Sequence, residues 1–156
     1  MHTLTRTADD CYKSLIQPLP IHPLANSPRP ETPLSVGALL TATSGDPSLV
    51  SQLKQEILHA DGVDMLVSFI KWSGIRIIKD ELKAFTRHGN LRVITTSYLG
   101  ATDLKAIKFL LTLPNTEVRV SFNTRQTRLH AKAYIFHRKS DFGAAYVGSS
   151  NISNPA

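Results

Sequence analysis

The chain has 156 residues, with 18 lysines and arginines against 12 aspartates and glutamates, a formal net charge of +6 and a pI near 9.7. This length suits one domain with a proper hydrophobic core, and the basic balance weakly favours a polyanionic partner. A single cysteine, Cys11, excludes an internal disulfide framework and is typical of a reducing cytosol. No apolar run approaches the roughly 20 residues that span a bilayer. Because Asp9 and Asp10 also interrupt any secretory-signal pattern, we expect a cytoplasmic protein without a membrane segment.

Residues 1–47 form a proline-rich leader, since seven of the nine prolines lie between positions 18 and 47. That density predicts an extended segment rather than a packed element. The leader also carries apolar side chains that could lie on the domain surface, so a docking strap is the alternative to a flexible leader: Leu15, Ile16, Leu19 and Ile21. The domain itself is expected over residues 48–156.

Helical and strand patterns alternate after the leader. Helices are expected over residues 46–60, 73–88 and 102–113. Gly89 is expected to end the second helix in a left-handed conformation, and Thr102 or Asp103 to cap the third before Pro114 stops it. Strands are expected over residues 63–70, 91–97, 117–122, 129–136 and 144–147. This order predicts an α/β domain with a mixed sheet flanked by helices on both faces.

The most informative pattern is His130-Ala131-Lys132 followed by Gly148-Ser149-Ser150-Asn151. On a strand, residues i and i+2 face the same way, so His130 and Lys132 are expected to point into one site. A neutral imidazole can attack phosphorus, and the other polar side chains can hold phosphoryl oxygens. Ser149 and Asn151 are expected where a helix begins, where free N–H groups and the helix dipole favour an anion. Taken alone, each half could be a core histidine, an exposed lysine or an ordinary turn; the pairing of the halves predicts phosphodiester chemistry.

These residues resemble the half-site motif of the phospholipase D superfamily, which reads His-x-Lys, then Asp, then Gly-Ser-x-Asn. The matching positions are His130, Lys132, Gly148, Ser149 and Asn151. The stretch from about Ser48 to Ala156 resembles in particular the phospholipase D-like nuclease domain found ahead of bacterial superfamily 2 helicases, with fitting segments at 67–74, 93–98 and 128–132. Two features differ from the family pattern. His137 stands where the family has its Asp, and the chain ends at Ala156, where family members continue, so the domain is expected to lack its C-terminal part.

The resemblance implies a metal-independent phosphodiesterase without cofactors that cleaves DNA, as the nuclease module of a helicase or restriction-like system. It also implies roles for the matching residues: His130 as a nucleophile that forms a phosphohistidine, Lys132 neutralising phosphoryl charge, and Gly148, Ser149 and Asn151 holding phosphate oxygens. A second histidine must protonate the leaving oxygen. Because the chain has one His-x-Lys, we expect a homodimer that shares one active site.

Basic residues near the motif suggest where nucleic acid binds. No acid occurs between Glu117 and Asp141. The residues expected to contact a nucleic-acid strand are Lys71, Trp72, Arg125 and Arg128, with Tyr98 a weaker candidate. Trp72 is equally compatible with the core, and His137 should face away from His130 on a regular strand. The alternative function is a non-cleaving nucleic-acid-binding module with an incomplete site. A lipid substrate is disfavoured because no amphipathic membrane segment is evident.

Overall fold

The computed structural model describes residues 48–123 and 129–153. The proline-rich leader lies outside these ranges, and so do Arg125 and Arg128. None of the helices in the described part of the chain combines the length and the apolar character that crossing a membrane requires.

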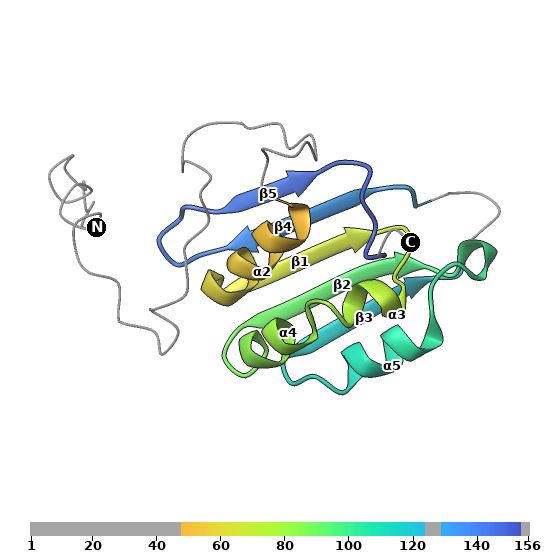
Figure 1. Cartoon of the computed structure of the whole chain (residues 1–156), viewed down its shortest axis with the longest axis horizontal. Coiled ribbons are helices and arrows are strands. Elements are labelled where there is room, and N and C mark those ends of the chain that lie inside the picture. The colour runs from red at the N-terminus through yellow and green to blue at the C-terminus, as the bar shows by residue number, and fades with distance from the viewer. Residues whose placement is uncertain (1–47, 124–128, 154–156) are drawn as a thin grey trace, which may run out of the picture.

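The domain is built on one five-stranded mixed sheet (Figure 1). Its strands are β1 Gly62–Val67, β2 Asn90–Thr96, β3 Thr116–Ser121, β4 Lys132–His137 and β5 Ala144–Val147. Their spatial order is β3-β2-β1-β4-β5. The first three strands run parallel, whereas β4 is antiparallel to β1 and β5 is antiparallel to β4. The predicted mixed α/β sheet with a terminal hairpin is thus confirmed.

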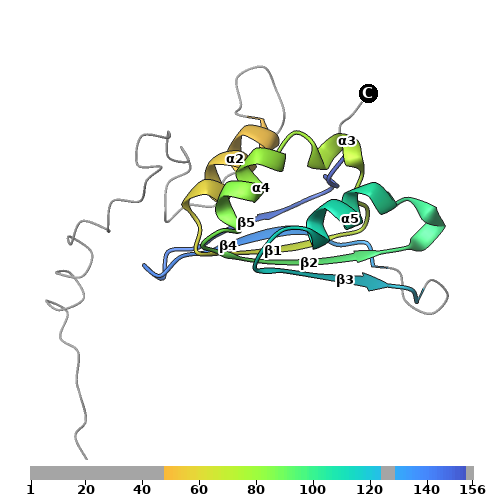
Figure 2. The ribbon, with the colours of Figure 1, turned by 90° about the horizontal axis from the view of Figure 1, so that it is seen from below.

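The helices are α2 Leu49–His59, α3 Trp72–Ile75, α4 Lys79–Phe85 and α5 Leu104–Leu111, with a 3-10 turn, η1, over Tyr98–Gly100. All of them lie on the same face of the sheet (Figure 2). Along β2, exposed residues alternate with buried ones, which is the pattern of a strand covered on one side. The structure therefore differs from the expectation of helices on both faces: within residues 48–123 and 129–153, one face of the sheet stays open.

The core lies between the helices and the face of the sheet that they cover. Val63, Met65 and Val67 of β1 point into it, and Ile57 of α2 and Leu82 of α4 are fully buried above the sheet. Each fully buried aliphatic side chain of this kind stabilises the fold by about 1.5–3 kcal/mol. This packing fixes the strand ends that carry the functional candidates.

Two details of the helices differ from the sequence expectations. The helix expected over 73–88 is broken into α3 and α4, because Ile77 N and Ile78 N bond to the carbonyls of Gly74 and Ile75, three residues back, and tighten the chain before α4 begins. Gly89 does not take a left-handed conformation. A Cβ at this position would lie 2.1 Å from the Phe85 ring, so close packing is what requires glycine.

Candidate active site

The two halves of the motif meet at the carboxyl end of β1. Lys132 is the first residue of β4 and pairs with Val67, the last residue of β1. His130 precedes the strand rather than lying within it, so the expected strand start at 129 is three residues too early. The two side chains, which the sequence predicted to point the same way from a strand, lie in contact with each other, as the distances show.

The Lys132 ammonium lies against the His130 imidazole. Its Nζ is 3.2 Å from Nδ1 and 3.1 Å from Nε2 of the ring, and it donates to the His130 carbonyl at 3.0 Å. Lys132 is 6% exposed, whereas His130 is exposed. A buried ammonium beside an accessible imidazole gives a nucleophile and a positive charge at one point, which suits attack on a phosphoryl group.

Residues 148–152 form no helix and contact both β4 and the segment that follows β1. Gly148 N donates to the Lys132 carbonyl at 3.1 Å, and the Tyr134 hydroxyl donates to the Ser150 carbonyl at 2.9 Å. Ile152 forms a parallel bridge with Ile70. These bonds bring the second half of the motif to the first.

This geometry corrects the expectation that a helix begins at Ser149 and Asn151. No helix occurs over residues 148–153, because their backbone pairs with the segment that follows β1. No helix dipole therefore attracts an anion to these residues. A Cβ at Gly148 would meet nothing within 4 Å, so packing within the described chain does not require glycine there.

The Asn151 side chain is oriented by the backbone of the neighbouring segment. Its Oδ1 accepts from Phe69 N at 3.1 Å. Because the amide oxygen is used in this way, the amide nitrogen remains as the end that can donate to a bound anion. Ser149 is exposed at the same edge of the sheet. The arrangement supplies hydrogen-bond donors next to the imidazole and the ammonium.

Lys71 and Trp72 follow β1, at the carboxyl end of the sheet, but both are engaged with Asp103. Its Oδ2 accepts from Trp72 N at 2.8 Å, and its Oδ1 accepts from Lys71 Nζ at 3.2 Å. The Trp72 backbone hydrogen bond, followed by the Lys71 ammonium, lowers the pKa of the Asp103 carboxyl. Asp103 occupies the predicted cap position of α5, yet its side chain makes no cap hydrogen bond, because it binds the start of α3 instead.

The Trp72 ring is packed against α5. It makes an edge contact with Phe109 at 5.7 Å between centroids, and Lys105 Nζ lies 4.6 Å from its centroid. Of the two readings of Trp72, the packed one fits these contacts better than an open stacking surface. The other predicted contacts, Arg125 and Arg128, lie outside the described residues.

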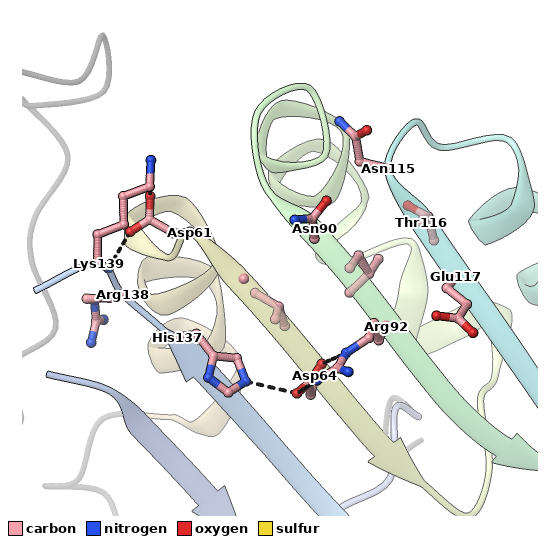
Figure 3. A pocket seen from close by; sticks show the side chains of 13 residues that line it. Asp61, Asp64, Asn90, Arg92, Asn115, Thr116, Glu117, His137, Arg138 and Lys139 are labelled. Atoms are coloured by element: carbon pink, nitrogen blue, oxygen red, sulfur yellow. Dashed lines mark hydrogen bonds and ion pairs between the residues drawn. The ribbon is translucent and has the colours of Figure 1, made fainter. Parts of the chain in front are cut away.

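His137 lies on the open face of the sheet, where the alternation of β4 directs it. His137 pairs with Gly62 at the amino end of β1, while Lys132 pairs with Val67 at the other end. Its Nε2 is 2.8 Å from Asp64 Oδ2, and Arg92 holds the same carboxylate through Nε at 2.6 Å and Nη2 at 2.5 Å. Figure 3 shows Asp64 between these two partners. All three residues line a broad pocket of about 780 Å³.

The Asp64–Arg92–His137 cluster was missed by the sequence reading. The Arg92 hydrogen bond is the main cause that lowers the pKa of the Asp64 carboxyl, and the His137 hydrogen bond adds to it. Asp64 and Arg92 are register partners on β1 and β2, 28 positions apart. Only the strand pairing reveals that they are neighbours. The position that holds Asp in the family motif is thus engaged in a separate cluster, at the far end from His130.

Comparisons with known proteins add a structural likeness. No protein-family model matches the chain, and no curated protein matches it either. Among solved structures, the chain is similar to NucT from Helicobacter pylori, with a TM-score of 0.47 and 19% identity over 67% of each chain.

Proposed function

We propose that this protein is a metal-independent phosphodiesterase that cleaves DNA through a phosphohistidine at His130. One observation carries the proposal: an exposed imidazole, a buried ammonium and the amide of Asn151 lie at one end of the sheet, supplied by the two segments 130–132 and 148–152. Phosphodiester cleavage needs a nucleophile and donors for the phosphoryl oxygens, and this group provides both.

In the first step, a lone pair of the His130 ring attacks phosphorus, an N–P bond forms and one P–O ester bond breaks. The leaving oxygen takes a proton from a second imidazole. Water then attacks the phosphohistidine, gives its proton to that second imidazole and releases His130. Throughout both steps, Lys132 balances the negative charge that grows on the phosphoryl oxygens, while Asn151 and Ser149 donate hydrogen bonds to them.

The second imidazole is proposed to come from a second protomer. The other histidines in residues 48–123 and 129–153 lie at the opposite end of the sheet: His59 ends α2, His88 precedes β2, and His137 ends β4. None of these can reach His130 within the same chain. A homodimer with two His130 side chains facing each other across a two-fold axis would complete the site.

The wider role proposed is that of a nuclease module in a helicase or restriction-like system. Its support is the resemblance of residues 48–156 to the nuclease domains that precede such helicases. The cleavage mechanism does not depend on this context, so it can be tested on the chain alone.

One observation favours a second function, a nucleic-acid-binding module that does not cleave. Among the described residues, the polar partner of the His130 ring is Lys132, and no carboxylate contacts the ring to orient it. Binding to the phosphate backbone would still use Lys132 and Asn151, and it would weaken steeply with salt.

Cleavage of plasmid and single-stranded DNA in EDTA tests the proposal, with the wild type beside His130→Ala. We expect cleavage by the wild type that survives chelation and is lost in the variant. His137→Ala is the matched control, because it removes the same ring from the other face of the sheet and should leave cleavage intact. Salt-sensitive binding without any wild-type cleavage would establish the binding module instead.

A further inference from the structure

Two large apolar side chains are exposed at the carboxyl ends of β2 and β3. Leu99, in η1 after β2, is 80% exposed, and Phe122, the first residue after β3, is 78% exposed. We call this pair the apolar ledge. Figure 1 shows the carboxyl ends of β1, β2 and β3 at the same side of the sheet, where β4 begins. The ledge and His130 therefore lie at the same end of the sheet.

The backbone that carries the ledge is held rigidly. The Ser121 carbonyl, directly before Phe122, accepts three hydrogen bonds: from Ser97 N at 3.0 Å, Thr96 Oγ1 at 3.1 Å and Ser97 Oγ at 3.3 Å. Leu99 has a φ of 55°, a left-handed conformation that is unfavourable for a residue other than glycine. Because the hydrogen bonds to Ser121 already order the backbone, only the side-chain torsions of Phe122 lose freedom when a flat partner packs on its ring.

The exposed Phe122 differs from Trp72, which the sequence offered equally as a stacking residue and as a core residue. The Trp72 ring already contacts Phe109 and Lys105. Phe122, by contrast, presents most of its ring surface to solvent. An open face next to a phosphodiester site is what a nucleobase requires, because every base has a flat apolar face.

We propose that Phe122 is a base-stacking residue that receives an unpaired base while the backbone of the same strand passes His130. The inference rests on the proposed function and specifies the substrate of that function: a nucleic-acid strand with unpaired bases. The described residues at this end of the sheet between β3 and β4, 121–123 and 129–132, contain no acid, which suits a polyanion there. The carboxyl end of β3 and the amino end of β4 are separated by three strand spacings, or about 14 Å. Inside an intact duplex both faces of each base are covered by neighbouring bases, so only a terminal pair has a face that could pack on the ring.

Binding of fluorescent oligonucleotides tests the inference, measured on the full chain carrying His130→Ala so that the probes stay intact. In this experiment, wild type means Phe122 in that background. The probes are a single-stranded oligothymidine, an abasic strand of equal length and a blunt duplex. We expect Phe122→Ala to weaken binding of oligothymidine about 5- to 150-fold, the range for one lost stacking contact, and to leave abasic binding unchanged. Phe122→Tyr retains the ring and should bind like the wild type.

Phe142→Ala is the matched control, because Phe142 is also exposed but lies in the connection between β4 and β5, at the other end of the sheet. Equal oligothymidine affinity for Phe122→Ala and wild type would overturn stacking and leave the proposed function standing. If Phe122→Ala weakened binding of the abasic strand as much as binding of oligothymidine, base stacking would also be overturned. A wild type that binds none of the probes would contradict the proposed function itself, and stacking with it.

Discussion

The two faces of the sheet hold their polar groups in opposite ways. On the helix-covered side, the Lys132 ammonium is buried next to an accessible imidazole, and the positive charge has no carboxylate partner in the described residues. On the open side, the imidazole of His137 is held by Asp64, which Arg92 also binds. The histidines are seven residues apart in sequence, yet the His130 ring is exposed beside Lys132 whereas the His137 ring is bound to Asp64. A positive charge without a carboxylate partner can bind a phosphate, whereas charges that are already paired serve the structure.

Ion pairs show the same contrast between the faces. Glu56, on α2, is 2% exposed and accepts from Arg138 and from the Tyr146 hydroxyl. Arg92 and Asp64 form a similar pair on the open face, where water reaches the guanidinium. Burial raises the cost of removing one partner, because the remaining charge cannot be solvated.

The largest expected effect follows from that burial. Arg138→Met should lower the free energy of unfolding by about 3–5 kcal/mol, because it leaves the Glu56 carboxylate buried without its cation. Arg92→Met is the matched control on the open face and should cost about 0.2–1 kcal/mol. Urea unfolding of both variants measures the difference. If the two variants lost similar amounts of free energy of unfolding, burial would not determine how much each ion pair contributes to stability.

Lys132→Met tests whether the buried ammonium serves catalysis rather than folding. The methionine fills a similar volume, so we expect the variant to stay folded. Loss of the charge that stabilises the phosphoryl oxygens should lower the DNA cleavage rate about 100- to 1,000-fold. Single-turnover cleavage measures the rate, and thermal unfolding measures stability. An unfolded variant, or one that cleaves at the wild-type rate, would remove Lys132 from the proposed mechanism.

Local patterns were sufficient for much of the fold. The sequence pattern predicted all five strands, and β5 was predicted at its observed bounds, Ala144–Val147. The contact between His130 and Lys132 is also local, since the residues are two positions apart. The expected helix after Gly148 was wrong for residues 148–153, because tertiary pairing of Ile152 with Ile70 replaced it. Local propensity carries no information about such a long-range bridge.

The open face was missed for a related reason. The apolar run of β1 suggested a strand covered on both sides, but Asp64 and Leu66 alternate with its buried residues and face the open side. The exposure of Phe122 could not be read from the sequence either, since aromatic residues at strand ends are often buried. Both features depend on which elements pack nearby, and they become visible only when the sheet is assembled.

The smallest expected effect concerns Asp64 and pH. Its folded pKa is lowered, chiefly by the Arg92 hydrogen bond, so the carboxylate contributes stability above the unfolded pKa of about 3.9 and loses it as pH falls through the folded pKa. At pH 7, Asp64→Asn should reduce the free energy of unfolding by no more than about 1 kcal/mol, and the difference from wild type should vanish at low pH. Urea unfolding across this pH range measures it. In an Arg92→Met background the pH-dependent difference should shrink, because the main partner of the carboxylate is gone; a difference that is equal at every pH would mean that Asp64 acts through packing and not through its charge.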